Sequence, residues 1–183
     1  IQETKFPKKS VMVLSGPNIA DEIMRKNISA SVIAGKNLST LEKVSQLFTT
    51  KYFKTFISQD IKGVEMSGAL KNLYAICSGL SDGLGFESNT KAMLLTRALK
   101  EMSNLFQEIK ANPKTLLGLS GVGDLIATSS STKSRNYSFG FFLGQGISPK
   151  EALDKIDQSV EGFGTLKVIF QKKNKFRIKM PIV

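Results

Sequence analysis

The sequence predicts a mainly α-helical protein that begins with a few strands and one helix of an α/β sheet. Short β-type runs alternate with a helical stretch up to about residue 60, and helical periodicity takes over from Val64. The composition changes from β-rich to helix-rich at residues 60–63. We therefore expect residues 1–60 to be the end of one domain and residues 61–183 to form an all-helical domain.

The β-type runs of the first third cover residues 11–15, 30–34 and 52–57. β-branched and aromatic residues are frequent in them, which favours strands. Between the second and third runs, residues 39–48 carry leucine and valine at helical spacing. Strands that alternate with helices are typical of an α/β layer.

Two long helices are expected next, over residues 64–80 and 90–111. Asn89 is the expected N-cap of the second helix, and Pro113 closes it. Shorter helical patterns follow at residues 114–117, 137–143, 150–156 and 165–172.

The composition is that of a folded protein rather than a disordered or membrane-spanning one. Hydrophobic residues make up 41% of the chain and charged residues 22%, and no apolar run approaches the ~18 residues that a transmembrane helix needs. The single cysteine, Cys77, fits a reducing compartment, so we expect a soluble cytoplasmic protein. The chain starts at Ile1 without a secretory signal, and we expect this to be a cut end.

The chain contains no histidine, which excludes a catalytic triad with an imidazole base. A zinc site would have to combine one cysteine with carboxylates, which is poor zinc chemistry, so no metal is expected. Proton transfer must therefore use Lys, Asp, Glu, Tyr or Cys.

A net charge of +11 attracts anions, whether nucleic acid, acidic lipid or a phosphorylated metabolite. One alternative is therefore a non-enzymatic module that binds anions or nucleic acid. Lysine outnumbers arginine, and the aromatic residues do not interleave with the basic run near the end of the chain, so nucleic acid is the weaker choice. That run, which a solvated face also explains, comprises Lys172, Lys173, Lys175, Arg177 and Lys179.

Lys71 lies in a predicted helix, where its neighbours three and four positions away include the small residues Ser67, Gly68 and Ala75. Small neighbours leave space above the amine, and partial removal from water favours its neutral form. Such a lysine suits general-base chemistry near neutral pH. The alternative is a lysine whose side chain runs along the helix to solvent.

Asp124 follows a glycine-rich segment that contains Gly118, Gly121 and Gly123. Glycines permit tight turns, which place Asp124 at or near a helix N-terminus, either as a functional carboxylate or simply as an N-cap. The glycine spacing differs from the G-x-G-x-x-G dinucleotide fingerprint, and no predicted strand precedes it.

A polar loop at residues 131–136 opens a predicted helix and offers donors for an anion. Arg135 supplies a bidentate fork, and Ser134 and Asn136 add neutral donors beside the backbone amides of the helix start. The alternative is a solvated helix cap. Further along, Glu161 could accept a hydrogen bond from a hydroxyl, and an exposed loop glutamate is the simpler interpretation.

The order and spacing of these segments resemble the bacterial-type NAD(P)-dependent glycerol-3-phosphate dehydrogenases over nearly the whole chain. Residues 14–20 (L-S-G-P-N-I-A) are similar to the family's L-S-G-P-S-F-A, with Asn18 where the family usually has Ser. The further blocks follow in the family's order, at residues 68–72 (G-A-L-K-N), 81–86 (S-D-G-L-G-F), 121–125 (G-V-G-D-L), 134–136 (S-R-N), 160–162 (V-E-G) and 180–182 (M-P-I).

The resemblance implies a helical domain like that of the 6-phosphogluconate dehydrogenase superfamily, preceded by the last β/α elements of a truncated Rossmann domain. It also implies reversible hydride transfer between NAD or NADP and dihydroxyacetone phosphate, giving sn-glycerol 3-phosphate for glycerophospholipid synthesis, by a full-length homodimer. This chemistry needs a base, an anion grip and a water-excluding pocket, but no metal. The G-x-G-x-x-G element is absent from the chain, so we expect a fragment. A dehydrogenase of the same superfamily for another hydroxy acid is the nearer alternative.

The resemblance assigns a role to each matching residue. Lys71 is the implied general base, which takes the hydroxyl proton while hydride leaves for the nicotinamide. Asp124 would help to hold the hydroxyl end of the substrate, and Arg135 the phosphate. Substrate contacts are implied for Gly16, Asn18, Lys71, Asn72, Asp124, Thr128, Ser134, Arg135 and Asn136, and cofactor contacts for Ala20, Arg135, Ser159 and Glu161.

Overall fold

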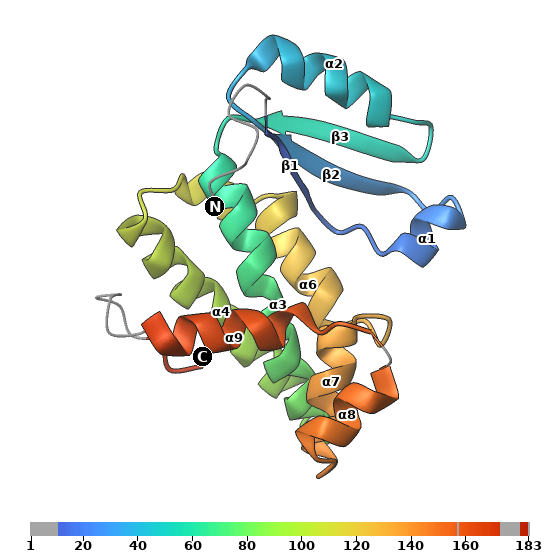
Figure 1. Ribbon diagram of the computed structural model, residues 1–183, viewed down its shortest axis with the longest axis vertical. Coiled ribbons are helices and arrows are strands. Elements are labelled where there is room, and N and C mark those ends of the chain that lie inside the picture. The colour runs from blue at the N-terminus through green and yellow to red at the C-terminus, as the bar shows by residue number, and fades with distance from the viewer. Residues whose placement is uncertain (1–10, 157, 173–179, 183) are drawn as a thin grey trace.

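A computed structural model of the chain describes residues 11–156, 158–172 and 180–182. It places a small sheet with its helices above a group of packed helices (Figure 1). Two features of the sequence lie outside the described residues. They are the expected cut end at Ile1 and the basic residues from Lys173 to Lys179.

The sheet has three strands in the order β1, β2, β3. Strand β1 runs antiparallel to β2, and β2 runs parallel to β3. A helix connects each pair of strands, as a parallel crossover requires for the second pair. The predicted α/β beginning is thus confirmed, although the short α1 was not predicted. The elements are β1 (Val13–Ser15), α1 (Ala20–Met24), β2 (Ser29–Ala34), α2 (Leu38–Phe48) and β3 (Phe53–Ser58).

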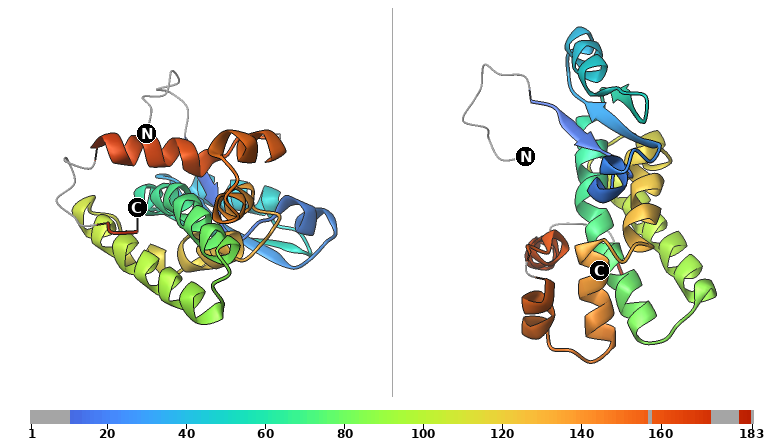
Figure 2. Two further views of the ribbon diagram at one scale, coloured as in Figure 1. Left: turned by 90° about the horizontal axis from the view of Figure 1, so that it is seen from below. Right: turned by 90° about the vertical axis from the view of Figure 1, so that its right-hand side faces the viewer.

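The rest of the described chain is helical, as predicted. The long helix α3 lies at the centre, with α4, α7 and α9 packed around it (Figures 1 and 2). The helices are α3 (Ile61–Gly83), α4 (Ser88–Glu108), α5 (Pro113–Leu116), the π-helical turn η1 (Leu119–Gly123), α6 (Asp124–Ser129), α7 (Arg135–Gly144), α8 (Pro149–Ile156) and α9 (Glu161–Lys172).

Two predicted boundaries were wrong for identifiable reasons. Helix α4 begins at Ser88 with Glu87 as its N-cap residue, so Asn89 lies inside the helix rather than capping it. It ends at Glu108, because the chain turns at Lys110 with a φ of 55°. Pro113 therefore starts α5, where its missing N–H costs nothing, and does not close α4.

Apolar side chains of α3 and α4 form the largest buried cluster. Leu70 and Tyr74 of α3 are fully buried against Met102 and Phe106 of α4, which are fully buried too. A smaller cluster joins α3 to α7, to α8 and to the segment before α9. These contacts hold the starts of α7 and α9 beside the middle of α3, which is where Lys71 lies.

Helices α3 and α7 approach each other so closely that their backbones touch. A Cβ atom on Gly79 of α3 would collide with the carbonyl oxygen of Tyr137, and one on Gly140 of α7 with the carbonyl oxygen of Ile76. Only glycine fits at these two positions. The separation of the two helices is consequently fixed by main-chain contact.

Among the helices of the described segments, none has both the length and the hydrophobicity that crossing a lipid bilayer would require.

Candidate active site

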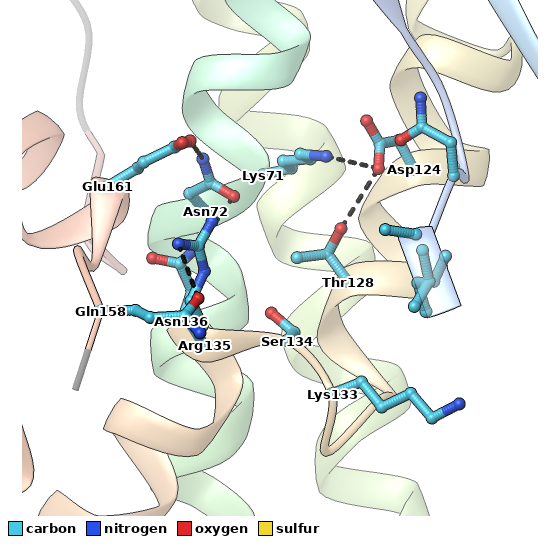
Figure 3. A pocket seen from close by; sticks show the side chains of 14 residues that line it. Lys71, Asn72, Asp124, Thr128, Lys133, Ser134, Arg135, Asn136, Gln158 and Glu161 are labelled. Carbon is cyan, nitrogen blue, oxygen red and sulfur yellow. Dashed lines mark hydrogen bonds and ion pairs between the residues drawn. The ribbon is translucent and has the colours of Figure 1, made fainter. Parts of the chain in front are cut away.

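A cavity of about 500 Å³ opens where the loop after β1 meets α3, α6 and the first turns of α7 and α9. Figure 3 shows side chains from these elements turned toward it. Most of the predicted site residues line this cavity, namely Asn18, Ala20, Lys71, Asn72, Asp124, Thr128, Ser134, Arg135, Asn136 and Glu161.

An ion pair between Lys71 and Asp124 forms one side of the cavity. The Lys71 Nζ lies 2.6 Å from the Asp124 Oδ1, and the Lys71 side chain is 19% exposed. The same carboxylate oxygen accepts a hydrogen bond of 3.2 Å from the hydroxyl of Thr128. The alternative of a lysine reaching out to solvent is therefore wrong, because the amine faces a buried carboxylate (Figure 3).

The Asp124 side chain is almost completely removed from water, and this burial raises the pKa of its carboxyl above the ordinary value. The ammonium of Lys71 and the hydroxyls of Ser15 and Thr128 oppose that rise, since each of them stabilises the carboxylate. The amine donates a hydrogen bond to the carboxylate beside the cavity. Such a pair is chemically suited to passing a proton to a ligand or taking one from it.

The π-helical turn η1 brings Asp124 to this position. A Cβ atom on Gly121 would collide with the carbonyl of Leu116, so the tight turn needs glycine there. Helix α6 then begins at Asp124, as predicted. The N-cap alternative is wrong, because Gly123 is the N-cap residue and the Asp124 carboxylate turns to Lys71 instead.

Arg135, the first residue of α7, forms the opposite side of the cavity. Its guanidinium donates a hydrogen bond of 3.3 Å to the side-chain oxygen of Gln158, and no carboxylate of the described residues pairs with it. Ser134 caps the helix by accepting from the backbone N–H of Tyr137 at 3.3 Å. A guanidinium without a carboxylate partner, beside a helix N-terminus, is suited to binding an anion such as phosphate.

Three side chains form a hydrogen-bonded chain at the base of the cavity. The Asn136 amide donates to the Asn72 side-chain oxygen at 3.0 Å, and the Asn72 amide donates to Glu161 at 3.2 Å. The Asn136 oxygen also accepts from the backbone N–H of Gly162 at 2.9 Å. These bonds join α3, α7 and α9. Glu161 is thus the first residue of a helix rather than part of a loop.

The loop after β1 provides the rim of the cavity on the side of the sheet. The Asn18 amide donates a hydrogen bond of 3.0 Å to the Ser31 hydroxyl. Gly16 does not line the cavity, and its backbone packs so close to β2 that a Cβ atom there would lie 2.8 Å from the Ser31 Cα. Ser159 does not line it either.

Four lining residues were not among the predicted site residues. Lys133 lies within the polar loop at residues 131–136, and Gln158 lies three positions before Glu161, so their place in the sequence is the signal that could have found them. The other two are apolar and give no such signal; they are Ile19 and Ala127.

In the part of the chain that the structure describes, no group of three or more acidic or cysteine side chains is placed to hold a metal ion. The single cysteine, Cys77, lies partly buried in α3, and burial raises the pKa of its thiol to about 11. The thiol is therefore protonated at neutral pH.

Known proteins resemble this chain in sequence over its whole length. The profile of the family described as NAD-dependent glycerol-3-phosphate dehydrogenase C-terminus matches residues 60–183. The glycerol-3-phosphate dehydrogenases (NAD(P)+) of Ectopseudomonas mendocina and Pseudomonas fluorescens are 46% and 45% identical to it over 183 residues. The match includes 100% of this chain and 54% of each relative, so the chain spans about half the length of the curated relatives.

Solved structures of similar proteins have the same fold. The crystal structure of glycerol-3-phosphate dehydrogenase from Coxiella burnetii superimposes with a TM-score of 0.92 and 36% identity, covering 94% of this chain and 53% of that one. The corresponding protein of Dunaliella salina gives a TM-score of 0.82 and 29% identity, covering 89% of this chain and 30% of that one. These similarities confirm the predicted fold and do not favour a non-enzymatic anion-binding module.

Proposed function

The chain belongs to the family of NAD-dependent glycerol-3-phosphate dehydrogenase C-terminal domains, and we propose on this premise that it is the substrate-holding part of such an enzyme. The reaction is reversible hydride transfer between NAD(P)H and dihydroxyacetone phosphate, which gives sn-glycerol 3-phosphate. One observation carries the proposal: the amine of Lys71 and the guanidinium of Arg135 line the same cavity. The substrate carries a hydroxyl and a phosphate, and its binding therefore needs one group for proton transfer and a second, cationic group for the phosphate.

Lys71 is the proposed proton-transferring residue. In the oxidative direction its amine takes the hydroxyl proton of glycerol 3-phosphate, and in the reductive direction it returns a proton to the carbonyl oxygen. Asp124 holds the amine in place at 2.6 Å. Thr128 and Asn72, on either side of Lys71 in the cavity (Figure 3), then contact the hydroxyl or carbonyl end of the substrate.

Arg135, Ser134 and Asn136 are the proposed contacts of the phosphate. The guanidinium offers two parallel N–H donors to phosphate oxygens, which is the geometry that arginine provides better than lysine. The backbone N–H groups of the first turn of α7 point the same way along the helix axis and favour a negative charge.

The nicotinamide, when bound, accepts or donates the hydride. Three lining residues fit the hydrogen-bonding groups of its amide and ribose, because the side chains of Asn18 and Glu161 offer oxygen acceptors and Ala20 is small. Gly16 supports the same loop, and Ser159 precedes the helix that carries Glu161. The G-x-G-x-x-G element is absent from the 183 residues, so the pyrophosphate needs a nucleotide-binding part outside them.

We also propose that residues 1–60 belong to that nucleotide-binding domain and residues 61–183 to the substrate domain. The intact enzyme would act as a cytoplasmic homodimer without a metal and supply glycerophospholipid synthesis. The support for these points is the resemblance of the sequence blocks and the single protonated cysteine.

The decisive experiment is the Lys71→Ala substitution in protein that contains both this chain and a nucleotide-binding part. We expect kcat for dihydroxyacetone phosphate reduction to fall by about 10²- to 10⁴-fold, with KM changed only a few-fold, because a proton-transfer group acts mainly in the transition state. Lys91→Ala is the matched control, since Lys91 pairs with Asp82 and does not line the cavity. A Lys71→Ala variant that keeps the wild-type kcat would refute the proposal.

A further inference from the structure

We propose that Ser15, at the end of β1, is a positioning residue that orients the Asp124 carboxylate toward Lys71. The inference rests on the proposed function, because it concerns the same proton-transferring pair. Ser15 is not among the residues that line the cavity. It acts through Asp124.

The hydrogen bonds of Asp124 are divided between its two oxygens. Oδ1 accepts from the Lys71 amine and from the Thr128 hydroxyl, whereas Oδ2 accepts from the Ser15 hydroxyl at 3.2 Å. Asp124 is 2% exposed and Ser15 is 8% exposed, so water cannot easily replace the serine. Loss of the hydroxyl leaves a buried carboxylate oxygen without a donor, and the orientation of the carboxylate is then fixed only by the bonds to Oδ1.

The position of Ser15 is set from two sides. In the sheet, Ser15 of β1 pairs with Val32 of β2. Its hydroxyl packs against α3 at Gly68. A Cβ atom on Gly68 would lie 3.1 Å from the Ser15 Oγ, a distance tighter than ordinary contact. Gly68 lies one helical turn before Lys71. The sheet therefore touches α3 beside the proposed base, and Ser15 is the contact between them that reaches Asp124.

A positioning role has a distinctive pH signature. The Ser15 hydrogen bond lowers the pKa of Asp124 against the effect of burial. Without this hydrogen bond, the Asp124 carboxyl keeps its proton up to a higher pH. While it is protonated, it no longer forms an ion pair with the Lys71 ammonium. The acidic limb of the pH profile of kcat should then move to higher pH.

The test compares Ser15→Ala, Ser15→Thr and the exposed control Ser39→Ala in protein that carries the nucleotide-binding part. We expect Ser15→Ala to lower kcat about ten- to a hundredfold, as for loss of a hydrogen bond to a charged group, with KM changed less than about threefold. Its acidic limb should move to higher pH. Ser15→Thr, which keeps the hydroxyl, should restore most of kcat and the wild-type limb, and Ser39→Ala should change neither.

The pKa of Asp124 in the same variants, followed by NMR of ¹³C-labelled aspartate carboxyls, separates the two proposals. If Lys71→Ala abolishes turnover but Ser15→Ala alters neither kcat nor the acidic limb, the positioning role is overturned and the proposed function stands. If Lys71→Ala keeps full activity, the proposed function fails. In that case a higher Asp124 pKa in Ser15→Ala still supports the orientation of the carboxylate, and an unchanged pKa overturns it.

Discussion

The two basic side chains that line the cavity beside the proposed substrate differ in their partners. Lys71 already has a carboxylate partner, Asp124, at 2.6 Å, whereas the only side-chain hydrogen bond of the Arg135 guanidinium among the described residues goes to the neutral Gln158. An incoming anion meets no competing carboxylate at Arg135. Under the proposed function, this geometry would divide the work, with proton transfer on α3 and anion binding at the start of α7.

This division leads to a prediction for Arg135→Lys. The substitution keeps the positive charge but removes the planar fork, so we expect KM for dihydroxyacetone phosphate to rise by about tenfold or more while kcat falls less. Steady-state kinetics of the protein with its nucleotide-binding part would measure this. Arg97→Lys, on the exposed part of α4, is the control and should behave like wild type. An unchanged KM in Arg135→Lys would show that the fork does not hold the phosphate.

The sequence predicted some interactions of the site residues and not others. The polar loop before α7 predicted an anion-binding site, because Arg135 and the neighbouring donors are close together in sequence. The pairing of Lys71 with Asp124 could not be predicted from spacing, since 53 positions separate them and the π-helical turn before Asp124 has no sequence pattern of its own. The hydrogen bond from Ser15 was not predicted at all, because it crosses from the sheet to α6.

Secondary-structure elements were predictable where apolar periodicity is strong. Helix α3 was expected over residues 64–80 and extends from Ile61 to Gly83. It begins at Ile61 because Asp60 caps it by accepting a hydrogen bond from the N–H of Gly63. Helix α9 starts at Glu161 instead of residue 165, since glycines at 162 and 164 obscured its first turn. The sequence contained no sign that glycines of α3 and α7 face each other.

The glycine contact between α3 and α7 can be tested with Gly140→Ala. The added methyl group would collide with the backbone of α3 at Ile76, and we expect the free energy of unfolding to fall by about 1–3 kcal/mol or more. Gly164→Ala is a matched control in α9, because nothing lies within 4 Å of its Cβ position. That variant should be neutral or more stable by up to ~1 kcal/mol. Urea unfolding of both variants gives the comparison, and equal stability would contradict the close packing.

Over the whole molecule, the segment at residues 180–182 packs against the cluster that α3 and α4 form. The backbone N–H of Ile182 donates to Glu101 of α4 at 2.9 Å, and the hydroxyl of Tyr74 of α3 donates to the other oxygen at 3.1 Å. Glu101 is 4% exposed. Burial raises the pKa of its carboxyl, although these two donors and Arg97 lower it in part. One buried carboxyl thus joins α3, α4 and the last described residues.

This carboxyl predicts a pH-dependent stability. A carboxyl whose pKa is raised by folding makes the native state less stable as the pH rises from its ordinary value through its raised value. Glu101→Gln removes that titration and keeps an acceptor for Ile182. We expect the stability of the wild type relative to Glu101→Gln to decrease as the pH rises through this window, as measured by thermal unfolding at a series of pH values. A difference that stays constant with pH would contradict a raised pKa.

The main-chain contact at Gly79 and Gly140 also limits how far the two helices that carry Lys71 and Arg135 can shift against each other. Lys71 extends from one of the touching helices and Arg135 begins the other. Because these helices cannot slide without collision, the backbone positions of Lys71 and Arg135 are fixed before a ligand arrives. In the proposed reaction, adaptation to a compound of another length would be left to the two side chains. Two residues without side chains would thereby contribute to chain-length selectivity.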